Sequence, residues 1–221
     1  MNASGGEKIC PICGYDSTKQ NPENCLPIGF VLNDRYTVGQ AKHSNGEGIA
    51  YIGWDNTEAS IVTVREYFPV GFAVRNTDKT VGIVKGGEYS FNEGLIEYID
   101  INRQIMESSQ PAQMPITDVL EENGTVYTVT QSISAITLRE FLAKNGGTLK
   151  WEQARPLFLP LIDTIKGMND LGIIHGGIST DTVIVGRDGK LRISGYGIKN
   201  LRICDSPLES VVFHGFAAIE Q

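Results

Sequence analysis

The cysteines are the residues most suited to binding a metal. Cys10 and Cys13 are separated by two residues in the stretch Cys-Pro-Ile-Cys-Gly, a spacing that lets two thiolates meet on one zinc ion while the glycine permits the turn. Cys25 could provide a third ligand, whereas Cys204 lies far along the chain. Because a structural zinc site takes four ligands, two hypotheses stand. One is a reduced, unligated dithiol in the N-terminal tail, and the other is a zinc ion shared with another chain or with residues lost from the N-terminus.

A second group of candidate residues lies in the C-terminal half. The stretch His-Gly-Gly-Ile-Ser-Thr-Asp-Thr, 175–182, follows an expected helix, and Lys-Leu-Arg-Ile-Ser-Gly-Tyr-Gly, 190–197, follows a short expected strand and a Gly-Arg-Asp-Gly turn. This order resembles two motifs of protein kinases, the catalytic loop H-R-D-x-x-x-x-N and the metal-binding D-F-G. In kinases the first Asp takes the substrate proton, and the Asn and the second Asp hold magnesium.

The resemblance extends upstream and covers Leu26 to Gln221. Residues 26–39, 48–55 and 62–69 look like the N-lobe of a bacterial serine/threonine kinase subfamily whose third strand ends in Lys-Glu-Tyr-Phe-Pro. The chain is therefore identified as a protein kinase-like domain in a degenerate, pseudokinase form. The resemblance implies an α+β, two-lobed fold: a tail with one CxxC knuckle at 1–27, a β-rich N-lobe at 28–133, and a helical C-lobe at 134–221 that is truncated after the activation segment.

The matched positions carry altered residues. Gly177 stands for the catalytic Asp, Thr182 for the Asn and Gly195 for the metal-binding Asp. Arg65 stands for the strand lysine and Ile101 for its helix glutamate, so we expect that ion pair to be absent. Because phosphoryl transfer depends on positioning and on neutralising phosphate charge, the resemblance predicts a chain without catalytic residues that is not an enzyme.

The nucleotide cleft implied by the resemblance is also altered. In the phosphate-covering loop only Gly48 keeps its glycine, although glycines are needed there for close approach of backbone amides to phosphate. We therefore expect ATP binding to be unlikely and no cofactor other than zinc at the cysteines. The cleft residues implied by the match are Asn45, Gly48, Thr63, Arg65, Thr130 and Gln131.

Local patterns predict the elements that position these residues. Alternating apolar residues over 36–66 indicate three strands in a meander, and Leu95, Ile96, Ile99 and Ile105 have helical spacing over 91–106. Asn123-Gly124 predicts a tight turn in a hairpin over 117–129. A long helix is expected over 151–171 despite two prolines.

Composition excludes several functions. A net charge of -7 gives no basic face for nucleic acid, and no apolar run reaches the roughly 18 residues of a membrane span. Without a signal-peptide pattern, a cytoplasmic location is expected.

We predict a catalytically inactive signalling or scaffold module whose former nucleotide cleft binds a protein partner, such as an active kinase or a regulator. The alternatives are a nucleotide-binding switch and an atypical serine/threonine kinase with residual ATP-dependent phosphoryl transfer.

Overall fold

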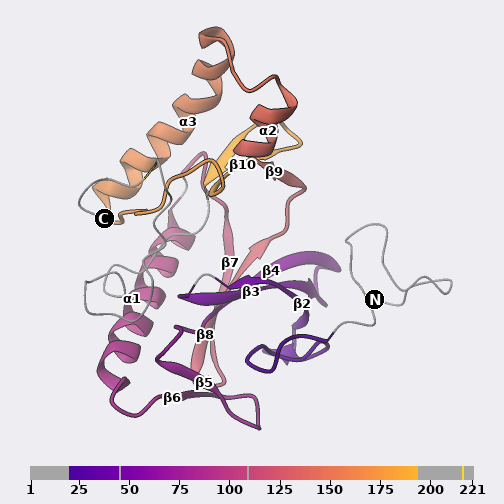
Figure 1. Cartoon of the computed structure of the whole chain (residues 1–221), viewed down its shortest axis with the longest axis vertical. Coiled ribbons are helices and arrows are strands. Elements are labelled where there is room, and N and C mark those ends of the chain that lie inside the picture. Colours follow the sequence, from indigo (N-terminus) through magenta and orange to yellow (C-terminus); the bar gives the residue numbers. More distant parts are fainter. Residues whose placement is uncertain (1–19, 45, 109, 194–215, 217–221) are drawn as a thin grey trace, which may run out of the picture.

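The chain folds into two lobes (Figure 1). The computed structural model describes residues 20–44, 46–108, 110–193 and 216. The first lobe contains a six-stranded sheet, a two-stranded hairpin and helix α1, and the second contains a three-stranded sheet with helices α2 and α3. The predicted α+β, two-lobed architecture with a β-rich N-lobe is confirmed.

The six-stranded sheet is antiparallel throughout, in the order β1-β2-β3-β4-β8-β7. The predicted meander and hairpin are both present, and Asn123 and Gly124 have the positive φ angles that a tight turn needs. Because β4 lies between β3 and β8, side chains from all three strands come together near its middle. The strands are β1 (Val31–Leu32), β2 (Tyr36–Ser44), β3 (Gly48–Asp55), β4 (Ser60–Tyr67), β7 (Ile116–Glu122) and β8 (Thr125–Gln131).

Helix α1 (Glu88–Glu107) covers one face of this sheet beside β7 and β8 (Figure 1). It buries Phe91, Gly94, Tyr98 and Ile105, whose spacing places them on one side of the helix. The predicted helix over 91–106 is confirmed, and it begins three residues earlier than predicted, at Glu88. Ile96, which the periodicity included in the apolar face, is instead 56% exposed.

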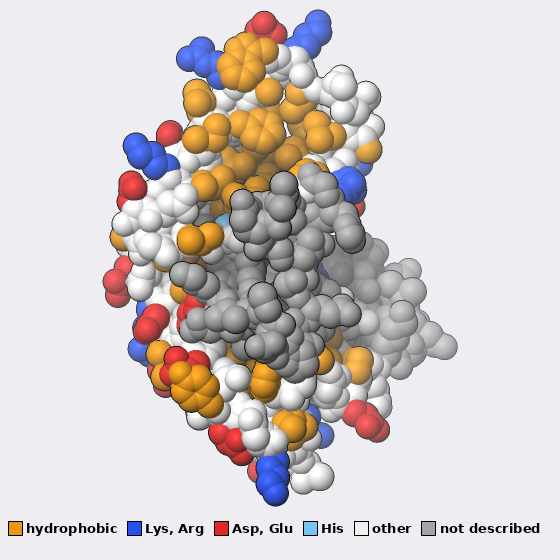
Figure 2. Space-filling model, turned by 60° about the vertical axis from the view of Figure 1, so that its left-hand side comes forward, with side chains coloured by type: hydrophobic (Ala, Val, Ile, Leu, Met, Phe, Trp, Pro, Cys, Tyr) orange, Lys and Arg blue, Asp and Glu red, His pale blue; other side chains and the backbone are white. Residues whose placement is uncertain are grey.

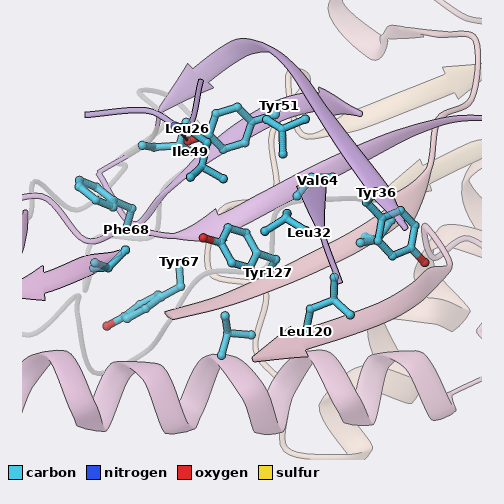
Figure 3. Close-up of a cluster of buried hydrophobic side chains, with 14 of the residues drawn as sticks. Leu26, Leu32, Tyr36, Ile49, Tyr51, Val64, Tyr67, Phe68, Leu120 and Tyr127 are labelled. Atoms are coloured by element: carbon cyan, nitrogen blue, oxygen red, sulfur yellow. Dashed lines mark hydrogen bonds between the residues drawn. The ribbon is translucent and has the colours of Figure 1, made fainter. Parts of the chain in front are cut away.

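The core around the six-stranded sheet is rich in tyrosine (Figure 3). Tyr67 lies on the side of β4 that faces α1, whereas Leu120 and Tyr127, which are paired across β7 and β8, lie on the other side of the sheet with Glu66. The Tyr67 ring packs against the Phe91 ring at 5.2 Å between centroids. Burial of these large rings supplies much of the hydrophobic free energy that holds the helix on the sheet.

A buried polar cluster ties the hairpin of β5 (Ala73–Arg75) and β6 (Val81–Ile83) to β4. The fully buried carboxylate of Glu66 accepts hydrogen bonds from Tyr51 at 2.7 Å, from Tyr127 at 3.0 Å and from Arg75 at 2.6 Å. Burial raises the pKa of both tyrosines, so their hydroxyls remain protonated donors. The cluster satisfies a charge that would otherwise be costly to bury.

The second lobe follows β8. A capping box begins α2, because the Thr137 hydroxyl accepts from the Glu140 amide and the Glu140 carboxylate accepts from the Thr137 amide. The long helix α3 is confirmed despite Pro156 and Pro160. The elements are β9 (Ala135–Thr137), α2 (Leu138–Lys144), α3 (Trp151–Asp170), β10 (Val183–Gly186) and β11 (Leu191–Ile193), with sheet order β11-β10-β9.

Within the described ranges, no helix has both the length and the apolar character needed to cross a membrane.

Candidate functional site

Arg65 lies near the middle of β4, opposite Ala50 on β3 and Thr128 on β8. Its guanidinium donates to the carboxylate of Glu47 with an Nη2–Oε2 distance of 3.3 Å. The same guanidinium lies 6.0 Å from the centre of the Tyr98 ring on α1, within the range of a cation–π contact. Both charged side chains are largely shielded from solvent, at 20% exposed for Arg65 and 8% for Glu47.

Arg65 has a carboxylate partner, Glu47, that the resemblance did not predict. This partner comes from the turn between β2 and β3, which precedes Gly48. Arginine reaches this carboxylate because its planar fork is larger than an ammonium and carries several donors. Sequence reasoning missed Glu47 because no motif position requires an acid there.

Ile101, the residue matched to the helix glutamate, packs in an apolar cluster. Its neighbours there are Ile105 from the same helix, Met168 from α3 and Ile173 after α3. The position on α1 therefore serves contact between the lobes, and the carboxylate that pairs with the cation has a different origin.

Close packing of β3 against β4 requires a glycine at position 48. A Cβ at this position would collide with the carbonyl oxygen of Glu66 on the paired strand, so only glycine fits without a backbone shift. The turn before it is held by the backbone, since Phe68 N–H donates to the Glu47 carbonyl at 3.1 Å and Val70 N–H donates to the Gly46 carbonyl at 2.8 Å.

The structure brings five of the six predicted cleft residues onto three neighbouring strands. Gly48 is on β3, Thr63 and Arg65 are on β4, and Thr130 and Gln131 are on β8. Thr63 is paired directly with Thr130 across β4 and β8. Asn45 lies outside the described residues.

The loop matched to the catalytic loop is closed by its own hydrogen bonds. The buried His175 accepts from the Gly177 amide at 3.2 Å through Nδ1. The Thr182 hydroxyl donates to the Gly177 carbonyl at 2.8 Å and accepts from the Ser179 amide at 2.8 Å. At the position matched to the catalytic Asp, Gly177 offers only its backbone. At the position matched to the Asn, the Thr182 hydroxyl is bonded within the loop.

Asp181 is the carboxylate of this loop. It forms a two-point ion pair with Arg139 of α2, with both N–O distances at 2.8 Å. The hydrogen bonds from Arg139 hold the pKa of Asp181 below its ordinary value. Its role in this structure is to fasten α2 to the loop.

Of the predicted metal ligands, Cys25 is described and Cys10 and Cys13 are not. Cys25 is buried in the sheet core, and its thiol donates to the Asn24 side chain with an S–O distance of 3.6 Å. Burial raises the pKa of this thiol, which disfavours the thiolate that binds zinc. Among the described residues no cluster of three or more His, Cys, Asp or Glu side chains forms a metal site. Gly195, matched to the metal-binding Asp, also lies outside the described residues.

Comparison with known proteins identifies the fold. The apo form of PpkA-294 superposes with a TM-score of 0.68 and 28% identity, covering 79% of this chain and 62% of that one. The kinase domain of PknI from M. tuberculosis gives a TM-score of 0.58 at 12% identity, with the same two coverages, 79% and 62%. No family model matches the chain.

Curated relatives are also kinases. A mouse (Mus musculus) protein, the mutant form of sperm motility kinase Tcr, is 28% identical over 94 residues, which is 42% of this chain and 19% of that protein. The fission yeast (Schizosaccharomyces pombe) serine/threonine-protein kinase cds1 is 21% identical over 173 residues, covering 78% of this chain and 37% of the kinase. The chain thus spans well under half the length of these two relatives.

Fold and comparisons together define a protein kinase-like domain. More specifically, the chain is similar to a serine/threonine-protein kinase, the fission yeast cds1. The prediction that it is not an enzyme is contradicted, because the similar proteins are named as kinases. That prediction equated changed side chains at motif positions with lost activity, whereas the fold and a strand cation at Arg65 are retained.

Proposed function

We propose that this kinase-type domain acts in signalling by binding a protein partner, such as an active kinase or a regulator. The observation that supports this proposal is an exposed apolar surface on α3. Trp151, Leu159 and Ile162 are 71%, 45% and 56% exposed, and at 100° per residue they fall within about 80° of one another around the helix. We call these three residues the α3 apolar surface.

The opposite side of the same helix packs against the rest of the protein. Leu161, Thr164 and Met168 are buried against the rest of the protein. Figure 2 shows hydrophobic side chains gathered on the upper part of the molecule, the end that contains α2 and α3 in Figure 1. Exposed apolar groups of this kind mark interaction surfaces, and tryptophan is enriched among residues that dominate binding energy. This location replaces the cleft as the proposed contact surface.

A pair of substitutions tests the proposal. A partner is isolated with the chain from its native cell, purified, and titrated against the wild type and two variants by calorimetry. Ile162→Lys should weaken Kd at least tenfold, which is about 1.4 kcal/mol, because it places a charge in the apolar contact. Ile96→Lys on α1 is the control, since Ile96 has the same 56% exposure but lies in the other lobe. Equal affinity of all three proteins, or no saturable binding by the wild type, would reject the α3 apolar surface.

A second candidate function is nucleotide binding with atypical phosphoryl transfer. It is favoured by the retained cation at Arg65 on the central strand β4 and by the kinase names of the similar proteins. Arginine recognises phosphate through two parallel hydrogen bonds where lysine acts as a point charge. In this candidate Arg65 would hold a phosphate group of ATP.

A further inference from the structure

Glu47 holds the cation on which the second candidate function depends. Its carboxylate belongs to a residue only 6% exposed and lies 3.3 Å from the guanidinium of Arg65. A carboxylate this far from solvent requires a cation or several donors to offset the loss of hydration. The pairing with Arg65 is therefore part of the folded structure and not an incidental surface contact.

Carboxylate and phosphate oxygens use the same face of a guanidinium. Both offer two acceptors at the spacing of the arginine fork, so one group at this fork hinders the other. The neighbouring carboxylate cannot take over, because Glu66 on the same strand is bound to Arg75, Tyr51 and Tyr127. Glu47 is thus placed to compete with a phosphate group for Arg65.

The backbone of Glu47 is tied to the segment that follows β4. Its carbonyl accepts from Phe68 N–H, and the preceding Gly46 carbonyl accepts from Val70 N–H. These bonds fix the turn to the segment after β4 and do not involve the carboxylate. Rotation of the Glu47 side chain would break its bond to Arg65 without breaking strand pairing between β3 and β4.

We propose that Glu47 is a specificity-determining residue that excludes phosphate-bearing ligands from Arg65 by occupying its guanidinium as an internal phosphate mimic. The inference rests on the second candidate function, because it requires Arg65 to face an anion site. Ligands with a triphosphate bind only when the Glu47 side chain is displaced, so the ion pair sets the affinity of the site.

The test uses the whole chain, with ATP, inorganic triphosphate and adenosine as separate probes in magnesium-free buffer. Affinities are measured by calorimetry for the wild type, Glu47→Gln and Glu93→Gln, an exposed position on α1 that matches the change in charge. Glu47→Gln should bind ATP and triphosphate at least tenfold more tightly than the wild type, with adenosine affinity unchanged. Glu93→Gln should behave as the wild type. Adding Arg65→Ala to Glu47→Gln should abolish the gain.

A second variant covers the case in which Glu47→Gln does not fold. Glu47→Asp keeps the charge but shortens the side chain, and it should show a smaller gain of the same kind. Equal binding by the wild type and the Glu47 variants, lost on Arg65→Ala, would overturn the inference while leaving the second candidate function intact. Absence of phosphate binding in every folded variant, or binding indifferent to Arg65→Ala, would overturn both.

Discussion

Arg65 and Thr182 differ from their kinase counterparts in opposite ways. Arg65 keeps the charge of the residue it replaces and gains Glu47 as a partner. Thr182 replaces an amide with a hydroxyl that donates to the Gly177 carbonyl inside its own loop. At the matched positions the described residues thus present a guanidinium paired with a carboxylate and a hydroxyl bonded within its loop.

Magnesium should not strengthen ATP binding to this domain. Gly177 provides no side chain, and the Thr182 hydroxyl is already bonded to the Gly177 carbonyl and the Ser179 amide. Melting temperatures are compared with ATP plus magnesium and with ATP plus chelator. A ligand at a hundredfold excess over Kd adds about 2.7 kcal/mol, which is roughly 5–10 °C for a domain of this size. The melting temperatures of the two series should agree within about 1 °C, which is far smaller than the shift that full binding produces. A shift of several degrees that requires magnesium would contradict the prediction.

Among the elements, the hairpin β5–β6 depends on a buried ion pair. The side chains of Arg75 and Glu66 are 3% and 0% exposed, and their N–O distance is 2.6 Å. Arg75 also lies over the Phe68 ring at 4.8 Å. The Glu-Tyr-Phe-Pro run therefore contributes an acid that anchors the hairpin, and its tyrosine and phenylalanine fill the core around that acid.

Removing the arginine should be costly. Arg75→Ala leaves the Glu66 carboxylate buried without its cation, so the free energy of unfolding should fall by about 3–5 kcal/mol. Arg103→Ala is the control, because Arg103 and Glu121 form an ion pair with both side chains more than half exposed. It should cost no more than about 1 kcal/mol. Urea unfolding measures both free energies of unfolding. Similar losses in the two variants would show that the buried ion pair stabilises the fold no more than the exposed one.

At the scale of the whole molecule, the lobes share an apolar cluster. Ile105 from α1, Met168 from α3 and Ile173 are each nearly fully buried in it. A hydrogen bond of 2.8 Å from the Ala112 amide to the Thr164 hydroxyl joins α3 to the segment before β7. These contacts should make the two lobes unfold together.

Met168→Ala should destabilise both lobes by about 2–5 kcal/mol through the cavity it leaves. Met106→Ala, at a site 41% exposed on α1, should change stability by less than about 0.5 kcal/mol. The chain has two tryptophans, Trp54 on β3 and Trp151 on α3, so Trp54→Phe and Trp151→Phe give one fluorescent reporter per lobe. Coincident urea midpoints for the two reporters, shifted equally by Met168→Ala, are expected. Separate midpoints would mean that the cluster does not couple the lobes.

Local sequence determined much of the fold. Periodicity located α1, alternation located β2 to β4, and Asn123-Gly124 located the turn of the β7–β8 hairpin. The resemblance of the 175–182 and 62–69 stretches to kinase motifs predicted the two-lobed architecture that the comparisons bear out. These features follow from residues close in sequence or from motif order, and both can be read along the chain.

Only the tertiary structure decided which side chains meet. Glu47 and Arg65 are 18 residues apart on different elements, and Ile101 joins an apolar cluster drawn from α1, α3 and the segments beside them. The burial of Cys25 in the sheet core likewise depends on how the segment before β1 packs against β3. Strand register and helix packing set these distances, and neither is encoded in the spacing of the residues themselves. For this reason the elements around Arg65 could be predicted, whereas the carboxylate that pairs with it could not.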